Sequence, residues 1–592
     1  MKDFVKMTLA TLLGLFIFGI VSFFLSLSTL GALASLGETT PVMPREGVLK
    51  LDMSKISIQE QTQEMDPLQL LQSQEMITPV GIYDAVRAIK GAAEDPAIKF
   101  VYLLPDAASA GISHLEELRR ALEDFRQSGK PVVSFMENPS NAGLYLASVS
   151  DKIYMSSYEG SMNTVTGLSS QMYFLKDILD RIGVNVQLIR HGKYKSAGEM
   201  YIRNSASEAN KEQYTQMVSS VWGTLAGQIA ASREIPVERL NSMIDNLELN
   251  KPEDFLKSGL VDEIVTRDEL HQRLCNLFVT NDYKDIKAIT LADYAKLKNT
   301  VNYKAASKVA VVYANGEIVD SEDIQNIEGD RFAKIISDIR RDDQVKAVVL
   351  RVNSPGGSVF ASEKIRTELE LLGKEKTLVA SYGDYAASGG YWISAGCDKI
   401  YSNATTLTGS IGVFSMIPDL SKVIKDKIHV GVTTINSNKH SDMYSLMRPL
   451  DAKEIAYMQA SVEDIYEKFT GIVAQARDMS VADVDAIAQG RVWTGADAMG
   501  IGLVDEIGTL EDAINYAAVS IEGVSSSSEV MIQEYPAPMT AFDILLESLS
   551  NTQDQEIFSG TPFENIEAAF RSWTSADAGK AYARMPYIFD IR

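Results

Sequence analysis

The tetrapeptide Asp-Lys-Ile-Tyr at residues 151–154 recurs at residues 398–401, so the two copies are 247 residues apart (398 − 151). The hexapeptide Gly-Leu-Val-Asp-Glu-Ile likewise occurs at 259–264 and again at 502–507. Reading backwards from the tetrapeptides at the first offset, the two stretches align without a gap. Internal similarity at a fixed spacing indicates that one structural unit is present twice.

The length of the chain agrees with a duplicated unit, because 592 residues are too many for one hydrophobic core. We predict four parts. They are an N-terminal anchor at 1–37, a first repeat at 45–300, a second repeat at 305–525, and a C-terminal tail at 526–592 to which the sequence assigns no structure.

Apolar runs and helical stretches alternate within each repeat. In the second repeat, 308–318 and 345–353 are runs typical of buried strands, and helical patterns at about 329–341 and 360–372 follow them. Such alternation predicts an α/β fold with parallel strands joined by crossover helices. In such sheets the chemistry lies in loops beyond the carboxyl ends of the strands.

The composition excludes several classes of protein. The 56 Lys and Arg residues against 79 Asp and Glu give a net charge of −23, which argues against a nucleic-acid partner because phosphates require a basic surface. The two cysteines, Cys275 and Cys397, form no Cys/His cluster, so we expect free thiols and no metal site.

The N-terminal segment has the length and apolarity of a membrane-spanning helix. No charged residue lies between Met7 and Gly37, and Lys2 and Lys6 precede this stretch. The positive-inside bias then predicts a cytoplasmic N-terminus and an exported body. A cleaved signal peptide is the alternative, since 32–34 reads Ala-Leu-Ala, but the apolar stretch is longer than most cleavable signals.

Three loops of the second repeat differ from their counterparts in the first. NSPGG at 353–357 corresponds to DAASA at 106–110 in the first repeat. AASGG at 386–390 corresponds to a segment that contains Asn141, and the glycine-flanked Ser410 corresponds to Asn163. The glycines alone are more typical of tight turns than of a binding site, and AASGG is more typical of close helix packing. Selective divergence nevertheless favours a functional role, with Ser410 as a nucleophile.

A serine nucleophile needs an adjacent base, and none of the five histidines lies in a motif typical of one. Lysine is a known alternative, provided that it is desolvated and neutral. Lys195 follows an apolar strand in the first repeat, and an alignment of Ile189 with Ile435 places Ser441 at the equivalent position. The repeats are therefore complementary: one supplies a base and the other a nucleophile.

The motifs NSPGGSV, YAASGGYWISA, LTGSIGVF and GKYKSA together resemble those of the signal peptide peptidase A (protease IV) family in its long, tandem-repeat form. The resemblance implies two repeats of the fold shared by the Clp protease subunit and crotonase, and a serine endopeptidase with Ser410 as nucleophile and Lys195 as base. It also implies an oxyanion hole formed by the N–H groups of Gly357 and Ile411. Ser441 is the candidate that orients Lys195.

The same resemblance implies the setting of the reaction. The substrates would be released signal peptides and other hydrophobic peptides, bound as extended strands. The protein would be a single-pass protein of the bacterial inner membrane, with its body in the periplasm and assembled as a homotetramer. No cofactor or metal would be required.

Two other classes of function are open at this point. A crotonase-like acyl-CoA enzyme uses paired N–H groups against a thioester, but an exported chain does not meet coenzyme A. A catalytically inactive membrane scaffold is the other alternative, and the presence of both Ser410 and Lys195 argues against it.

Overall fold

The computed structural model describes residues 41–64, 77–321, 323–540 and 580–585, together with the single positions 14, 18, 19, 543 and 544. The predicted anchor at 1–37 lies outside this part of the chain apart from three positions and stays a prediction. Within the described residues, no helix has the length and apolarity needed to cross a membrane.

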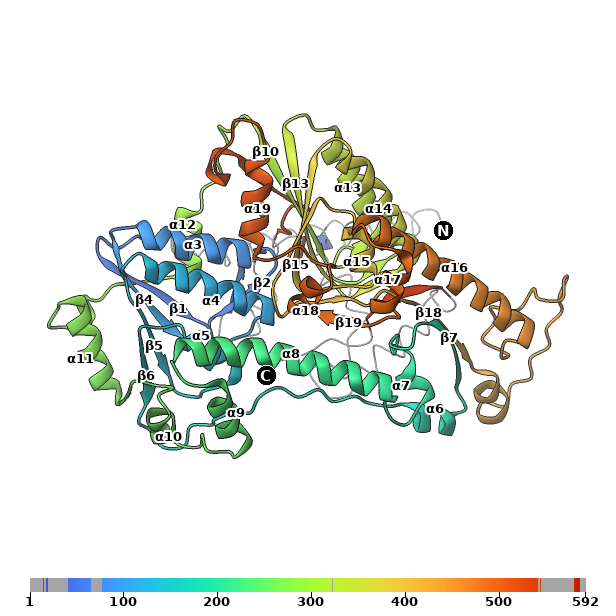
Figure 1. Ribbon diagram of the computed structural model, residues 1–592, viewed down its shortest axis with the longest axis horizontal. Coiled ribbons are helices and arrows are strands. Elements are labelled where there is room, and N and C mark those ends of the chain that lie inside the picture. Colours follow the sequence, from blue (N-terminus) through green and yellow to red (C-terminus); the bar gives the residue numbers. More distant parts are fainter. Residues whose placement is uncertain are drawn as a thin grey trace.

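The first repeat is built on a sheet of six parallel strands (Figure 1). In spatial order they are β8 (Glu263–Val265), β6 (Lys152–Ser156), β5 (Val132–Met136), β4 (Ile98–Leu104), β1 (Gly47–Asp52) and β9 (Ala288–Thr290). The central strands are apolar almost throughout and buried on both faces, as parallel sheets require. A short parallel pair, β2 (Ile56–Gln59) and β3 (Thr78–Gly81), lies beside it.

The second repeat has the same strand order. It runs β20 (Glu506–Ile507), β16 (Lys399–Ser402), β15 (Thr377–Ala387), β13 (Val345–Ser354), β10 (Lys308–Asn315) and β21 (Met531–Tyr535). Beyond β15 the sheet also carries β17 (Leu407–Gly409) and β19 (Val492–Thr494). The predicted α/β architecture is confirmed. The tail beginning at 526 contributes β21, which occupies the place that β9 has in the first sheet.

Helices cover both sheets and connect their strands. In the first repeat they are α3 (Ile82–Glu94), α4 (Ile112–Gln127), α5 (Asn141–Ala147), α6 (Lys176–Ile182), α7 (Glu199–Ile202), α8 (Glu208–Ser232), α9 (Val237–Asp245), α10 (Pro252–Lys257), α11 (Arg267–Phe278) and α12 (Leu291–Lys298). In the second they are α13 (Gly329–Arg341), α14 (Val359–Gly373), α15 (Gly389–Ser394), α16 (Ala452–Ala476), α17 (Val481–Ile487), α18 (Gly495–Gly500) and α19 (Leu510–Val519). The two predicted helices of the second repeat, α13 and α14, agree with these bounds to within about one residue.

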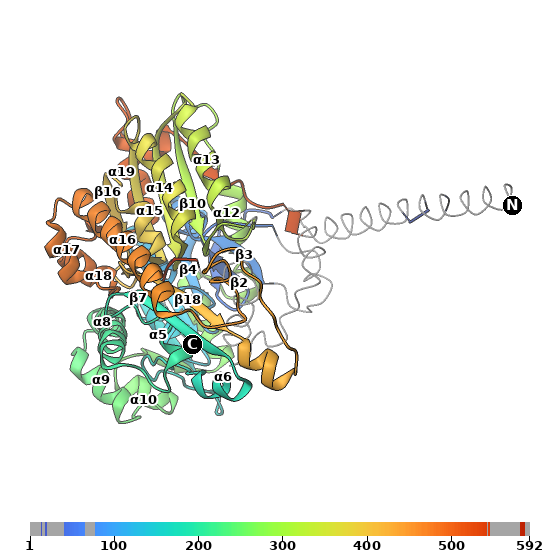
Figure 2. The same cartoon turned by 90° about the vertical axis from the view of Figure 1, so that its right-hand side faces the viewer.

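A third sheet joins segments that are far apart in the sequence. Its order is β12 (Ile327–Glu328), β11 (Ile318–Val319), β14 (Gly356–Ser358), β22 (Tyr582–Arg584), β18 (Val413–Asp419) and β7 (Asn185–His191). β7 belongs to the first repeat and pairs antiparallel with β18 of the second along its whole length (Figure 2). In Figure 1, the long helix α8 runs along the underside of the molecule between the first sheet and the region of α7 and β7. Residues 185–195 of the first repeat, which comprise β7 and the turn that leads to Lys195, thus form an arm that extends across the second repeat.

A buried ionic cluster also ties the repeats together. Arg351 on β13 is hydrogen-bonded to Glu60 at 2.6 Å and to Glu117 at 2.9 Å, and its remaining N–H groups reach Ser381 and the carbonyl of Tyr382. All three charged side chains are almost wholly inaccessible to solvent. Burial alone would raise the pKa of Glu60, but the positive charge of Arg351 lowers it to about 2. Glu60 therefore stays ionised beside Arg351 in the interior.

Replacement of Arg351 tests how far this cluster holds the repeats together. Arg351→Met should lower the free energy of unfolding by roughly 3–5 kcal/mol, because buried Glu117 loses its counter-ion and buried Glu60 keeps only His114 as a partner. Chemical denaturation followed by circular dichroism measures the change. The control is Arg340→Met, which removes a partly exposed ion pair with Glu375 and should cost less than about 1 kcal/mol. Equal, small effects of both changes would contradict the role given to the cluster.

Candidate functional site

Lys195 reaches the second repeat at the end of the arm. The chain turns at Gly192 after β7, and the N–H of Tyr194 donates to the carbonyl of Gln489 at 2.9 Å. Gly490 follows with a positive φ of 77°, and a Cβ at this position would lie 2.6 Å from the Lys195 nitrogen. Only glycine allows the two backbones to approach so closely. The Lys195 side chain is completely buried.

Ser410 lies in the loop between β17 and β18. Its backbone has a φ of 51°, which is uncommon for a residue other than glycine, and its N–H donates to the carbonyl of Arg491 at 2.7 Å. Gly409 before it also has a positive φ. This tight turn directs the serine side chain to Lys195.

The structure brings Lys195 and Ser410 into direct contact. The lysine Nζ lies within hydrogen-bonding distance of three oxygens: Ser410 Oγ at 3.0 Å, the Ser410 carbonyl at 3.0 Å and Ser388 Oγ at 2.7 Å. These partners are hydroxyls and a carbonyl, so none offers a negative charge. Burial accordingly lowers the pKa of Lys195 well below its ordinary value of 10.5. A neutral amine within hydrogen-bonding distance of a hydroxyl can accept its proton.

Ser388 is the residue of this site that sequence reasoning missed. It precedes α15, has a φ of 56°, and its N–H donates to the carbonyl of Gly409 at 2.8 Å. Two serines with positive φ therefore converge on one lysine, and backbone strain of this kind clusters at functional sites. The signal was present in the repeat comparison, since the first repeat has Asn141 at the corresponding position, where it binds its own loop at Gly167.

The structure also locates the two predicted oxyanion donors. Ile411 directly follows Ser410, and its carbonyl accepts the N–H of Gly490 at 2.8 Å. Gly357 lies on β14, which packs closely against the start of α15, and a Cβ there would overlap the carbonyl of Ile318. Ile411 is thus adjacent to the serine in the sequence and Gly357 lies on a strand beside α15, and their role as oxyanion donors stays a prediction.

Ser441 does not take the position predicted for it. It lies in the exposed segment between β18 and α16 and is hydrogen-bonded to Ser437 and to the N–H of Asn438. The alignment assumed a strand around Ile435, but the structure has no strand there and Ile435 is 93% exposed. The hydroxyl that binds Lys195 is that of Ser388 instead.

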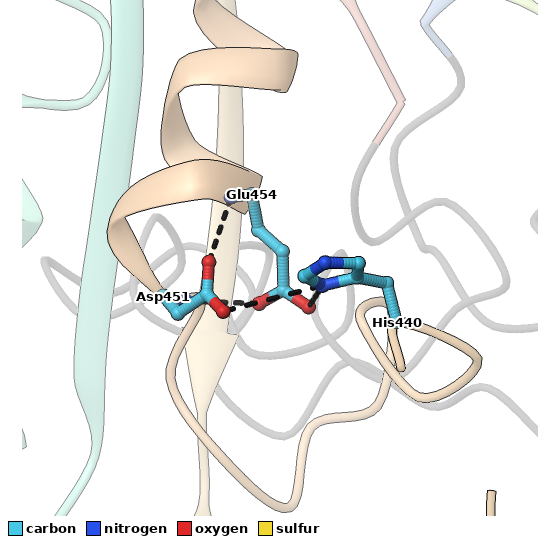
Figure 3. Close-up of side chains that lie close together, drawn as sticks. All are labelled: His440, Asp451 and Glu454. Atoms are coloured by element: carbon cyan, nitrogen blue, oxygen red, sulfur yellow. Dashed lines mark hydrogen bonds and ion pairs between the residues drawn. The ribbon is translucent and has the colours of Figure 1, made fainter. Parts of the chain in front are cut away.

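Figure 3 shows a second polar cluster, formed by His440 of the same segment with Asp451 and Glu454 at the start of α16. Their spacing would suit a metal ion, but both oxygens of Glu454 accept hydrogen bonds of 2.7 Å from Arg448. These bonds lower the pKa of Glu454 to about 2. Asp451 caps the first turn of α16. The cluster therefore holds this segment against the helix.

Comparison with known proteins identifies relatives that match most of the chain. The sequence matches the model of peptidase family S49 twice, at residues 124–279 and 370–523. It is 34% identical over 533 residues to a Haemophilus influenzae protein named Protease 4. This alignment covers 87% of this chain and 85% of the relative. An Arabidopsis thaliana protein named chloroplastic serine protease SPPA is 29% identical over 469 residues, spanning 78% of this chain and 68% of that one.

Among solved structures, a ClpP1 variant from Listeria monocytogenes aligns with 34% of this chain and 93% of that one. The sequence identity is 16% and the TM-score is 0.24, a similarity too weak to carry an argument.

The contact between Ser388 and Lys195 predicts a measurable effect on the reactivity of Ser410. Ser388→Ala should slow the labelling of Ser410 by a fluorophosphonate probe by about 10-fold to 100-fold, because the loss of one hydrogen bond to a buried group costs about 1–3 kcal/mol. The matched control is Ser394→Ala, which removes an equally buried hydroxyl that is hydrogen-bonded to Tyr382. If both variants label at the same rate, Ser388 has only a structural role.

Proposed function

This chain belongs to peptidase family S49 and is a serine peptidase, and on that premise we propose that it cleaves peptides with Ser410 as nucleophile and Lys195 as general base. The observation that carries this proposal is the 3.0 Å distance between Lys195 Nζ and Ser410 Oγ at a fully buried amine. The family resemblance in the sequence motifs assigns the same two residues.

The reaction begins with a proton transfer. Neutral Lys195 removes the hydroxyl proton of Ser410 while Ser410 Oγ attacks the peptide carbonyl. The N–H groups of Gly357 and Ile411 stabilise the resulting oxyanion. The lysine ammonium then gives its proton to the leaving amine, and an acyl-enzyme remains. Water attacks the acyl group with Lys195 again acting as base, which releases the acid and restores the serine.

Ser388 fits this cycle as a positioning residue. Its hydroxyl binds the lysine Nζ at 2.7 Å and so restricts the rotation of a side chain that has four flexible bonds. With one hydrogen bond directed to Ser388 and another to the Ser410 carbonyl, the amine is held facing Ser410 Oγ. Ser388 thus orients the lysine base, as an acidic residue orients the histidine base in a Ser-His-Asp triad.

The remaining features of the proposal come from the sequence and the family. We propose that the repeats have the Clp protease/crotonase-like fold, that residues 1–37 anchor the chain in the bacterial inner membrane, and that the body lies in the periplasm. Its substrates would be released signal peptides and other hydrophobic peptides, cleaved by a homotetramer. The resemblance to signal peptide peptidase A supports these statements, as does the uncharged N-terminal stretch.

The dyad can be tested by substitution in the full-length protein purified in detergent. Ser410→Ala and Lys195→Ala should each reduce hydrolysis of a hydrophobic, signal-peptide-like substrate by roughly 10³-fold or more, because the two residues act as one unit. The control is Lys193→Ala, which removes an exposed lysine two residues away and should leave the rate unchanged. Near-parental activity of a folded Lys195→Ala variant would show that the base lies elsewhere.

The pH dependence tests the protonation state of the base. Only the neutral form of Lys195 accepts a proton, so kcat/KM should rise as the lysine loses its proton and then reach a plateau. Because burial lowers the pKa of Lys195 well below 10.5, this plateau should begin well below pH 10.5. An uncharged peptide substrate avoids titration of the substrate itself. A rise centred near pH 10.5 would mean that the reactive lysine is solvated.

A further inference from the structure

The turn that carries Lys195 is held by an ion pair whose carboxylate is fully buried. Arg190 on β7 donates one hydrogen bond to the carbonyl of Lys195 at 2.7 Å and another to Glu199 Oε1 at 3.2 Å. Glu199 has no accessible surface, and its N–H donates to the carbonyl of Ser196 at 2.9 Å. Its second carboxylate oxygen accepts the N–H of Ser207 at 3.1 Å. The base is thereby connected to Ser207, the N-cap residue of α8.

The same helix also reaches the loop that carries Ser410. Gln213, in the second turn of α8, accepts the N–H of Val492 at 2.8 Å through its side-chain oxygen. The residue before Val492 is Arg491, whose carbonyl accepts the N–H of Ser410 at 2.7 Å. Val492 also lies opposite Gly409 in the pairing of β19 with β17. Gln213 thus fixes the main chain that in turn fixes the nucleophile.

The burial of Gln213 indicates that this one contact is the reason for a polar side chain here. Gln213 has no accessible surface, and within the described part of the chain its Nε2 has no hydrogen-bond partner. A buried amide donor without a partner is unfavourable, and an apolar side chain of similar size would avoid it. What glutamine adds at this position is the hydrogen bond from its oxygen to the main chain of Val492.

A single stiff element therefore connects both members of the pair. Ser207 and Gln213 are 6 residues apart (213 − 207), which corresponds to about 9 Å along the axis of a helix. Two turns further on, the hydroxyl of Ser220 is hydrogen-bonded to that of Thr494 at 2.8 Å, and Thr494 also lies on β19. α8 is thus fixed against β19 at two points, so its N-terminus has a defined place relative to the Ser410 loop.

We propose that the N-terminal end of α8 sets the separation of Lys195 and Ser410, with Glu199 positioning the base and Gln213 positioning the nucleophile. This inference rests on the proposed function, because it takes Ser410 as the nucleophile and Lys195 as the base. Both side chains act through the main chain, so they are positioning residues. Their loss should therefore lower kcat and leave KM nearly unchanged.

Replacement of Glu199 tests the base side of this arrangement in the full-length protein. Glu199→Gln should lower kcat for a hydrophobic peptide, and the rate at which a fluorophosphonate probe labels Ser410, by about 10-fold or more, because a small displacement of a catalytic group is sufficient for such a loss. KM should change by less than about threefold.

The matched control is Asp262→Asn. One oxygen of Asp262 accepts the main-chain N–H of Ile153, and the other accepts a hydrogen bond from Arg233, which also donates to the carbonyl of Gly259. This carboxylate has the same kinds of partner as Glu199, but it lies at β8, on the far edge of the first sheet. Asp262→Asn should lower Tm as Glu199→Gln does and leave probe labelling unchanged.

Replacement of Gln213 tests the nucleophile side. Gln213→Met keeps a flexible side chain of similar size but removes the acceptor of the Val492 N–H, so probe labelling should again slow by about 10-fold or more. The control is Gln216→Met on the same helix, because Gln216 is exposed and its Nε2 reaches Asp497 of the second repeat only at 3.4 Å. Labelling of this control should proceed at the parental rate.

The pH dependence of labelling separates the two roles. When Glu199→Gln loosens the turn of Lys195, water reaches the amine, so the half-maximal pH should move upward toward 10.5, the ordinary pKa of lysine. Gln213→Met leaves the surroundings of the amine closed, and its half-maximal pH should equal that of the parent. A general loss of stability would move neither profile.

The outcomes distinguish this inference from the proposed function. A parent protein that neither hydrolyses peptides nor is labelled at Ser410 would refute the proposed function. Crystal structures of the Glu199→Gln and Gln213→Met proteins would then decide the positioning, since the distance between Lys195 Nζ and Ser410 Oγ should exceed 3.0 Å in both. An unchanged distance, or labelling at the rates of the matched controls, would overturn the role given to α8.

Discussion

The burial of Lys195 is the constraint on which the arrangement of the two repeats depends. Among the described residues no carboxylate forms an ion pair with it, and its hydrogen bonds go to two hydroxyls and a carbonyl. Such a site disfavours the ammonium form and would expel a charged side chain into water. The lysine can be kept there only because its backbone is fixed, by the pairing of β7 with β18 on one side and by the contact with Gly490 on the other.

The arm that carries Lys195 is effective only if the two repeats do not move relative to each other. Arg351 provides this rigidity, since it is bound by Glu60 and Glu117 from the first repeat while lying on the central strand of the second. The N–H groups of Ala404 and Thr405 are in turn bound by Glu116 on α4. A buried ion pair contributes little net stability, but it is costly to break, so it favours one relative placement over others. The 3.0 Å distance between Lys195 Nζ of the first repeat and Ser410 Oγ of the second requires the repeats to keep one relative placement.

The sequence predicts the repeated α/β units and the contact between Ser410 and Lys195, because long apolar runs carry a clear pattern and because the repeats differ selectively at these positions. It does not predict the third sheet, whose strands β11, β12, β14 and β22 have only two or three residues each and therefore no usable periodicity. Nor does the sequence single out Ser388, because small residues at the start of a helix more often indicate close packing. The prediction for Ser441 was wrong because a local alignment was extended into a segment that forms no strand in the second repeat.

The neutral form of Lys195 also depends on the exclusion of water. Ser410 and Lys195 are both buried, and the partners that the amine has besides Ser410 Oγ are the hydroxyl of Ser388 and the carbonyl of Ser410. None of these oxygens carries a negative charge, whereas water around the amine would stabilise its ammonium form. The packing that closes the site to water is therefore the same packing that favours the form of Lys195 able to accept a proton. On the proposed mechanism, a bound peptide must keep water away from the amine as well as present its carbonyl to Ser410.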